Sequence, residues 1–379
     1  MTHETVLKNA RIVLPDALLE GSVVLRDGLV ADVQPGAAAQ GEDMEGDYLV
    51  PGLVELHTDH LEGHYAPRPG VRWNALASIQ AHDAQIATSG ITTVFDCLRM
   101  GTTESDGFAP GEMRVLADTL AGAQDRGRLR ADHFIHLRCE VSAPDVMRDF
   151  DAFRGDARVR LVSLMDHAPG QRQFQTLEQY ELYYKTKRGL TEDAFARFVA
   201  ERQAQSQRYS TPHRRAIAEH CRGHGIALAS HDDATLDHVE EARGDGVRLA
   251  EFPTSHDAAR ASHGAGMSVL MGAPNIVRGG SHSGNIAARD LAEDGLLDVL
   301  SSDYVPFSLL HAAFRLAEDV AAVTLPAAIA MVTRNPARTI GLEDRGAIAA
   351  GQRADLVRVH AGDEVPLVRA VWRQGRRIA

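Results

Sequence analysis

The sequence predicts an α/β fold: a closed (β/α)8 barrel that carries a small β-sandwich domain built from both chain ends. Eight short apolar runs alternate with longer segments of helical character in the middle of the chain. The runs are nearly continuous in apolar residues, which is typical of parallel strands covered on both faces. Eight such units complete a barrel. An open doubly wound sheet is the alternative, but no GxGxxG motif follows the first run.

The eight predicted strands follow one another through the middle of the chain. They are GLVELHTD (52–59), GITTVFD (90–96), HFIHLRCEV (133–141), RLVSLMDH (160–167), GIALASHDD (225–233), VRLAEFPTS (247–255), MSVLMGAPN (267–275) and LDVLSSDY (297–304). Helices are expected between them. Thr211 is expected to cap a helix with Pro212 at its first position, which stops near Gly223 or Gly225.

Both ends of the chain predict a separate β domain. Residues 1–50 contain short segments of alternating polarity separated by Gly, Pro and Asp, which is the pattern of antiparallel strands. Residues 344–379 show the same pattern, and chain termini commonly lie close together. We therefore expect 1–50 and 344–379 to pair into one small domain, with the barrel at 51–343.

The charge and cysteine content limit the classes of partner and compartment. The 40 Lys and Arg against 52 Asp and Glu give a net charge of −12, which argues against a nucleic-acid or anionic-membrane surface. Three widely spaced cysteines form neither a disulfide framework nor a CxxC pair, which favours a reducing cytoplasm. The start of the chain lacks a secretory pattern, and no run approaches the roughly 18 apolar residues of a membrane span. The sequence leaves both a monomer and a homo-oligomer possible.

Polar residues follow the predicted strands where a barrel carries its chemistry, at the carboxyl ends. His57 and Asp59 are two residues apart, so they project to the same side of their strand. The other strands end in Glu140, Asp166, His231 and Asp303. Converging imidazoles and carboxylates suit a divalent cation such as Zn²⁺ and leave a position open for water. We expect these six residues to be metal ligands, with Asp303 also serving as general base.

Each of these residues also has a plainer interpretation. A single His or Asp at a strand end is commonly a capping or hydrogen-bonding group, and His60, His64 and His167 fit that interpretation individually. Asp303 could be a helix N-cap or part of a turn. Glu140 could neutralise Arg138, two residues before it.

The segment NIVRGGSHSGN (275–285), after the seventh predicted strand, predicts an anion site. Barrels commonly bind phosphate there, and adjacent glycines let backbone N–H groups approach an anion. The expected donors are Arg278, Gly279, Gly280, Ser281, His282, Ser283 and Asn285. Arg68 and Lys187 are further candidates, although the Lys187 stretch also fits an exposed helix end. The alternative for the glycine-rich segment is a flexible turn.

Taken together, these motifs resemble the amidohydrolase superfamily of metal-dependent hydrolases. The resemblance covers nearly the whole chain, through PGLVELHTD, GITTVFD, ASHDD, SSD, RNPAR (334–338) and GAIAAGQRADLV. Six further motifs, in this order, are similar to a narrower branch that hydrolyses α-D-ribose 1-methylphosphonate 5-triphosphate in the carbon–phosphorus lyase pathway. They are HTDHLEGHYAPRPGV, HLRCEVS, SLMDHAPGQ, AEFPTS, MGAPNIVRGGSHSGN and SSDYVPFSLL.

The chain departs from the common superfamily pattern in three places. His57-x-Asp59 stands where His-x-His is usual. Many relatives bridge two metals with a carboxylated lysine, but the three lysines of this chain lie outside the predicted strands, so Glu140 or Asp166 would have to bridge. The sixth strand offers Glu251 instead of a histidine. The number of metal ions is therefore one or two.

The resemblance implies a cytoplasmic metal-dependent diphosphatase, with zinc as the expected metal. It would convert a polyphosphorylated sugar, α-D-ribose 1-methylphosphonate 5-triphosphate, to the 5-phosphate and diphosphate. Asp303 would accept the proton of the attacking water, and Arg278 would stabilise the leaving diphosphate. Two alternatives stay open: an amidohydrolase acting on a cyclic amide or N-acyl substrate, and a non-catalytic scaffold on the same barrel.

Overall fold

The computed structural model describes residues 4–101, 108–172, 191–281, 285–362 and 364–379. Contacts divide the chain into two compact units. The first comprises residues 1–96, 118–134 and 271–379, and the second comprises residues 97–117 and 135–270. Within the described ranges, no helix is both long and apolar enough to cross a membrane.

Eight parallel strands form one sheet in the order β13-β12-β11-β10-β9-β8-β7-β6. They are β6 (Leu53–Thr58), β7 (Ile91–Met100), β8 (Asp132–Glu140), β9 (Val159–Met165), β10 (Ala227–His231), β11 (Leu249–Glu251), β12 (Ser268–Gly272) and β13 (Val299–Ser301). A parallel bridge between Thr58 and Asp303 joins the last strand to the first. All eight predicted strands are confirmed, and the sheet is a (β/α)8 barrel.

Helices follow the barrel strands. Those described are α1 (His60–Tyr65), α2 (Ala75–Thr88), α3 (Glu112–Asp125), α4 (Val146–Asp151), α6 (Glu192–His224), α7 (Leu236–Asp245), α8 (His256–Gly264), α9 (Ala273–Arg278), α10 (Ala288–Glu293), α11 (Ser308–Asp319), α12 (Leu325–Ala330) and α13 (Arg334–Thr339). The predicted cap at Thr211 is wrong. Helix α6 starts at Glu192, with Thr191 as its cap, and runs through Pro212. Its end is as predicted, at a left-handed Gly225.

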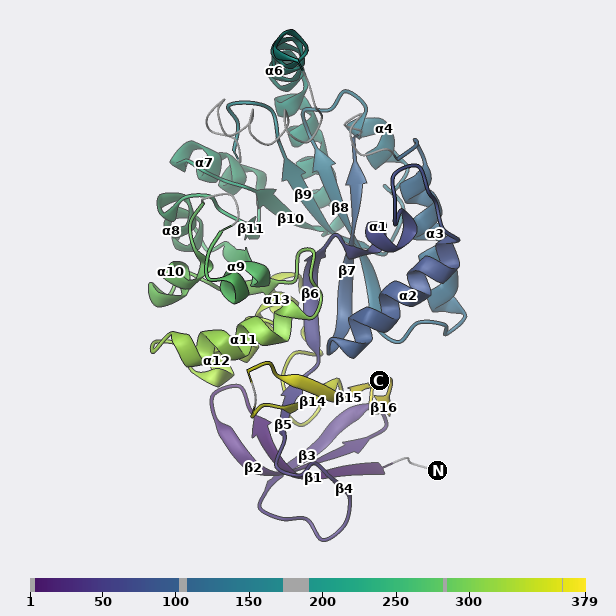
Figure 1. Ribbon diagram of the computed structural model, residues 1–379, viewed down its shortest axis with the longest axis vertical. Helices are drawn as coiled ribbons and strands as arrows, with labels where there is room; N and C mark the ends of the chain where they lie inside the picture. The colour runs from purple at the N-terminus through teal and green to yellow at the C-terminus, as the bar shows by residue number, and fades with distance from the viewer. Residues whose placement is uncertain (1–3, 102–107, 173–190, 282–284, 363) are drawn as a thin grey trace. The chain divides into compact units, whose positions relative to one another are not determined.

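The two ends of the chain share a second, mostly antiparallel sheet. Its strands are β1 (Glu4–Val13), β2 (Leu18–Arg26), β3 (Leu29–Pro35), β4 (Glu42–Asp43), β5 (Tyr48–Pro51), β14 (Leu356–His360), β15 (Leu367–Arg373) and β16 (Arg376–Arg377). Antiparallel pairing of β14 with β5 joins the two ends (Figure 1), as predicted. A buried cluster that includes Leu7, Ile12, Leu49, Leu356 and Trp372 forms its core.

Asp132, the first residue of β8, collects three arginines from the C-terminal part of the chain. The distances are 3.0 Å to Arg345, 2.7 Å to Arg353 and 2.7 Å to Arg373. Burial by itself would raise the pKa of Asp132, but the arginines outweigh it and lower the pKa. The end of the chain is therefore held to the amino-terminal side of a barrel strand by charge-assisted hydrogen bonds.

A buried network joins α2 to β7 and β8. Asp96 binds His82 with one oxygen and His133 with the other, each at 2.7 Å. The second nitrogen of His133 lies 3.3 Å from Asp83, whose carboxylate also accepts the backbone N–H of Arg130 at 2.8 Å. Burial by itself would lower the pKa of His133, but Asp96 and Asp83 raise it to about 9. His133 is therefore a buried cation between two carboxylates.

This network predicts a specific pH dependence of stability. Because the pKa of His133 is raised to about 9 in the folded chain, its stabilisation is fully present below the unfolded value of about 6.5 and is lost as the pH rises through 9. We expect His133→Gln to lower the free energy of unfolding at pH 7 by about 3 kcal/mol. The deficit should shrink between pH 7 and 10 in denaturant titrations.

The exposed His224 of α6 provides the control. His224→Gln should keep the pH dependence of the wild type, because the exposed His224 contacts only its own helix, through Nδ1 to a carbonyl and by stacking on His220. A deficit of His133→Gln that stays constant from pH 7 to 10 would contradict the charged state assigned to His133.

Candidate active site

The seam between β13 and β6 positions the first group of predicted site residues. The backbone oxygen of His57 accepts hydrogen bonds from Ser301 Oγ at 2.6 Å and from the Asp303 N–H at 3.1 Å. The Asp59 N–H donates in turn to the backbone oxygen of Asp303 at 3.0 Å. The structure therefore brings His57, Asp59 and Asp303 together, as strands one and eight of a closed barrel require.

Glu55 lies in the same seam and was not among the predicted site residues. Its fully buried carboxylate accepts the backbone N–H of His57 at 2.6 Å and that of Ser302 at 2.5 Å. Burial raises the pKa of Glu55 to about 7 although these hydrogen bonds oppose the shift. The signal in the sequence was a carboxylate inside an apolar strand, two residues before His57 and so on the same side.

The plainer interpretations of Asp59 and Asp303 hold in part, since Asp303 lies in a turn that the Val305 N–H closes on the oxygen of Ser302 at 2.9 Å. Asp59 is the N-cap residue of α1, yet its side chain makes no capping hydrogen bond. Asp303 is not at a helix cap, because α11 begins only at Ser308, and its φ of 54° is in the left-handed region. Such backbone strain in a residue other than glycine clusters at functional sites.

In the second unit, Glu140 at the end of β8 pairs with His167, which follows β9. Glu140 Oε2 lies 2.7 Å from His167 Nδ1, and the His167 N–H donates to Oε1 at 3.1 Å. The other ring nitrogen, Nε2, lies 3.6 Å from Asp232 Oδ2. Glu140 therefore fixes the orientation of His167.

His231, at the end of β10, is held in the same manner. Its Nδ1 lies 3.1 Å from Glu251, the buried last residue of β11, and its Nε2 lies 3.4 Å from Asp232. Glu251 also accepts Ser163 Oγ at 2.6 Å. Glu251, the sixth-strand residue noted above as a departure from the superfamily pattern, thus holds the Nδ1 side of His231.

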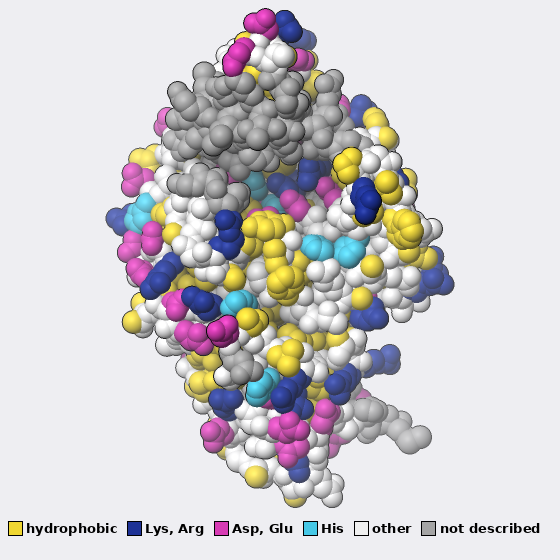
Figure 2. Space-filling view, in the orientation of Figure 1, with side chains coloured by type: hydrophobic (Ala, Val, Ile, Leu, Met, Phe, Trp, Pro, Cys, Tyr) yellow, Lys and Arg dark blue, Asp and Glu magenta, His cyan; other side chains and the backbone are white. Residues whose placement is uncertain are grey.

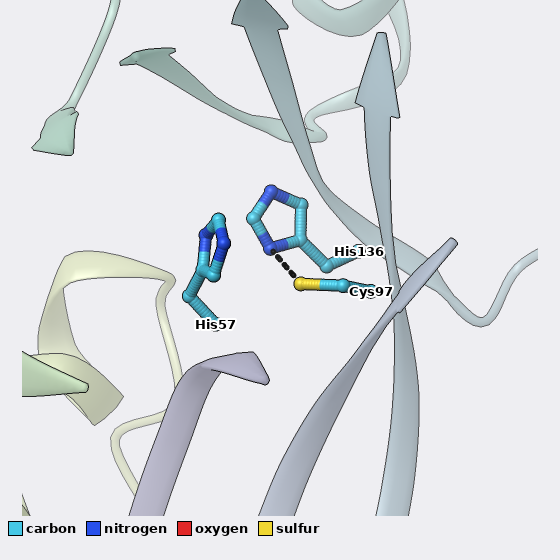
Figure 3. A group of neighbouring side chains, drawn as sticks. All are labelled: His57, Cys97 and His136. Carbon is cyan, nitrogen blue, oxygen red and sulfur yellow. Dashed lines mark hydrogen bonds between the residues drawn. The ribbon is translucent and has the colours of Figure 1, made fainter. Parts of the chain in front are cut away.

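Ser163 continues the network to His136 of β8 through a short contact with His136 Nε2. The other nitrogen of His136 lies 3.4 Å from Cys97 Sγ, an interaction that Figure 3 draws together with His57. Both Cys97 and His136 are buried, and Cys97 forms no disulfide. Side chains that could bind a metal or a proton therefore also lie within β7 and β8, before the ends of these strands.

His167, His231 and Asp232 form a group whose ligand atoms lie within 4.8 Å of one another. Each histidine has Nδ1 on a buried carboxylate and Nε2 toward Asp232, and this is how a carboxylate fixes the tautomer of a metal-binding histidine. Two imidazoles and one carboxylate fit a borderline divalent cation such as zinc. The sequence analysis treated His167 as a minor candidate and did not weigh Asp232, although both lie at the carboxyl ends of the predicted strands 160–167 and 225–233.

The electrostatics of this group follow from its carboxylates. Burial by itself would lower the pKa of His167, but Glu140 and Asp232 outweigh it and raise the pKa to about 10. Burial would raise the pKa of Glu140, but His167 lowers it to about 2. A cation that binds His167 must therefore displace a proton, since metal ligation requires the neutral imidazole.

Asp166 has a different environment from the other predicted ligands. Its Oδ2 accepts hydroxyl hydrogen bonds from Ser206 at 2.8 Å and Ser210 at 2.6 Å, and its Oδ1 accepts the Ala168 N–H at 3.1 Å. Burial, with Glu140 adding to it, raises the pKa of Asp166. The described contacts make Asp166 an anchor for α6 beside the end of β9.

The predicted anion loop starts as a helix. Arg278 is the exposed last residue of α9, and Gly279 caps the helix in the left-handed region. The Gly279 N–H donates to the oxygen of Ile276 at 3.1 Å, and the Gly280 N–H donates to that of Asn275 at 2.9 Å. Both amides therefore donate to carbonyls of the helix end, and anion binding at Gly279 and Gly280 stays a prediction. The two glycines end α9 and leave Arg278 exposed.

The remaining residues predicted to bind substrate differ in their exposure, and some lie outside the described ranges. Ser281 and Asn285 are partly buried on either side of residues 282–284, and Arg68 is exposed in a turn closed by the Val71 N–H at 3.0 Å. Lys187, His282 and Ser283 lie outside the described residues. On the face seen in Figure 2, acidic and basic side chains are interspersed, in keeping with a chain whose cations must act locally.

Known proteins are similar in sequence to this chain over nearly its whole length. α-D-Ribose 1-methylphosphonate 5-triphosphate diphosphatase of Escherichia coli (strain K12) is 46% identical over 376 residues, which cover 98% of this chain and 100% of that protein. An imidazolonepropionase of Deinococcus deserti is 25% identical over 396 residues, covering 95% of this chain and 92% of that protein. The more similar of the two relatives therefore acts on a sugar triphosphate.

Solved structures share the fold. N-Acetyl-D-glucosamine-6-phosphate deacetylase from Mycobacterium smegmatis matches with a TM-score of 0.65 and 19% identity, and the match covers 99% of each chain. A Xaa-Pro dipeptidase matches with a TM-score of 0.66 and 15% identity, also over 99% of each chain. The model of the amidohydrolase family matches residues 77–379. The resemblance expected from the motifs is thus confirmed, and the chain belongs to the amidohydrolase family.

Proposed function

We propose that this protein is a metal-dependent diphosphatase that hydrolyses α-D-ribose 1-methylphosphonate 5-triphosphate to the 5-phosphate and diphosphate in phosphonate catabolism. The observation that carries the proposal is the full-length, 46% identical relative with that diphosphatase name. The carboxylate-held histidines at the strand ends supply the chemistry that such a reaction needs. We place the enzyme in the cytoplasm, where its three buried free cysteines would stay reduced.

The proposed metal ligands come from the carboxyl ends of the barrel strands. Because all eight strands belong to one parallel sheet, their carboxyl ends share one rim of the barrel. His167, His231 and Asp232 would hold one cation, with Glu140 and Glu251 orienting the imidazoles. His57, Asp59 and Asp303 of the first unit are also proposed as ligands, for one or two ions in total, most readily zinc. We leave Asp166 out because both of its oxygens already accept hydrogen bonds.

A bound divalent cation would lower the pKa of a ligand water and polarise a phosphoryl oxygen. The protein supplies the remaining functions. Asp303, held over the β6 end by backbone hydrogen bonds, would accept the proton from the attacking water. Arg278, at the exposed end of α9, would bind the β- and γ-phosphates and stabilise charge on the leaving diphosphate. Ser281, Asn285 and Arg68 are further donors for the same groups, together with Lys187, His282 and Ser283.

The alternatives make different demands on the site. A cyclic amide or N-acyl substrate has no polyphosphate chain, so it needs no cationic clamp for a leaving diphosphate. A non-catalytic scaffold needs no metal ligands held by buried carboxylates. We prefer the diphosphatase because the relative with that name is far more similar to this chain.

The ligand assignment predicts the effect of three substitutions on metal content. His231→Gln and His167→Gln should each lower the metal bound per chain, while Glu251→Gln should weaken metal affinity by roughly 10–100-fold because it only orients His231. Elemental analysis after dialysis against buffered zinc measures both effects. His224→Gln is the matched control. Wild-type metal content in both histidine variants would remove these residues from the ligand set.

The clamp assignment predicts a selective loss in Arg278→Ala. Removing one charge-assisted contact should lower kcat/KM for the triphosphate, with the corresponding activation free energy raised by about 1.5–3 kcal/mol. The metal content should stay unchanged. Arg289→Ala is the control, since its guanidinium pairs with Glu293 on the neighbouring α10. Equal kinetics for Arg278→Ala and wild type across substrates with one, two and three phosphates would show that Arg278 does not bind phosphate.

The position of attack is testable with heavy-oxygen water. With the nucleophile fixed by the strand-end residues and the β- and γ-phosphates on Arg278, attack should occur at the α-phosphorus. The label should then appear in the sugar monophosphate, and diphosphate should leave unlabelled as one piece. Mass spectrometry separates the outcomes: label in the diphosphate, or release of orthophosphate, would contradict this arrangement of nucleophile and clamp.

A further inference from the structure

Three histidines gather between α1 and α2, both in the first unit. His60 and His64 lie on α1, and His82 lies on α2. Their ring centroids are 4.9 Å apart for His60 and His64, 6.1 Å for His60 and His82, and 5.9 Å for His64 and His82. One nitrogen from each ring lies within 4.8 Å of the others. We refer to these three residues as the α1–α2 histidines.

His82 is held as a metal-binding histidine is held. Its side chain is fully buried, and its Nε2 donates to Asp96 at 2.7 Å, which leaves a lone pair on Nδ1. Within the described residues, that Nδ1 is buried and has no hydrogen-bond partner. Asp96 is fixed in turn by His133 at 2.7 Å. A buried acceptor without a donor is destabilising, and a cation at Nδ1 would satisfy it.

The two histidines of α1 offer matching lone pairs. His64 Nε2 lies 3.2 Å from Gln85 Oε1, an acceptor, so the ring proton is on Nε2 and Nδ1 carries the lone pair. His60 Nδ1 is buried and, among the residues described, has no hydrogen-bond partner. His60 and His64 are only partly buried as side chains, and Figure 2 shows histidine side chains at the surface beside α1. An ion could therefore reach the group from solvent.

We propose that the α1–α2 histidines bind a transition-metal ion of the zinc class at a site separate from the ligands at the strand ends. Asp96 faces α2 through its contact with His82, so the group lies on the helix-facing side of β7. Three neutral imidazoles select zinc, nickel or copper over magnesium and calcium. Two nitrogens on one zinc ion lie at most about 4.2 Å apart, so small side-chain rotations would close the group.

The position of the site gives it a structural role. Helix α1 begins directly after Asp59, and α2 is anchored to the barrel strands through the Asp96–His133 network. A cation shared by His60, His64 and His82 would fasten α1 to this anchored helix. The segment that follows β6 would then be fixed at two points. One is the Thr58–Asp303 bridge before α1, and the other is the cation bound by the histidines of α1.

The test is zinc stoichiometry in the full-length protein, with His64 as the residue to change. His64 is partly buried, so His64→Gln should fold, and we expect it to bind one zinc equivalent fewer than wild type after dialysis. His64→Cys restores a zinc ligand and should regain that equivalent. In a His231→Gln background, the losses should add, because the two sites are independent. The rise in melting temperature on adding zinc should also be smaller in His64→Gln, by mass action.

His311→Gln is the matched control, because His311 Nε2 also has no hydrogen-bond partner among the described residues but lies on α11. It should bind as much zinc as wild type. Equal zinc content in His64→Gln, His311→Gln and wild type would overturn the proposal and leave a packed group of rings. Since the readout is zinc and melting temperature, it decides this site whether or not the protein proves to be a diphosphatase.

Discussion

The closure of the barrel at the β13–β6 seam is the constraint on which the seam side of the site depends. Backbone pairing of Thr58 with Asp303 converts an open sheet into a ring. Under it, Glu55 accepts the N–H groups of His57 and Ser302. A buried carboxylate is costly without such donors, so the seam and Glu55 stabilise each other. His57, Asp59 and Asp303 are positioned by main-chain hydrogen bonds of this seam.

One device recurs through the molecule: a buried carboxylate that holds one nitrogen of a histidine. Glu140 holds His167, Glu251 holds His231, and Asp96 holds His82. The carboxylate occupies one nitrogen and fixes the ring plane, so the opposite nitrogen points in one direction. The chain thus prepares histidines for cations at the strand ends and, by our inference, at the α1–α2 histidines.

The backbone turns sharply where the strands deliver these groups. Asp232, Phe252 and Asp303 follow β10, β11 and β13 directly or within two residues, and their φ values are 59°, 52° and 54°. A left-handed conformation costs such residues about 1–3 kcal/mol each, and the strand hydrogen bonds below them hold it. At Asp232, the N–H still pairs with the oxygen of Glu251 at 2.9 Å. The strained residues therefore lie at the strand ends that carry the candidate site.

The sequence by itself determined the eight strands, the pairing of the two chain ends and most of the strand-end residues. Apolar runs and turn signals are local, and the parallel barrel then assigns chemistry to the carboxyl ends. Local rules failed where a longer element overrode them. Thr211 and Pro212 have the composition of a helix start, yet they lie inside α6, which begins at Glu192 with Thr191 as its cap. The glycines after Arg278 have the composition of an anion loop, and their amides also end a helix.

Only the tertiary structure decided which partners the polar residues take. Glu251 and His231 are twenty residues apart, and Ser163 is a further 68 residues from His231. No local pattern links them, because their contact arises from the side-by-side order of β9, β10 and β11. The same holds for His82, Asp96 and His133, which meet because a helix packs on two neighbouring strands. A sequence gives the type and spacing of ionisable groups, but their protonation and roles depend on neighbours that only the packed chain supplies.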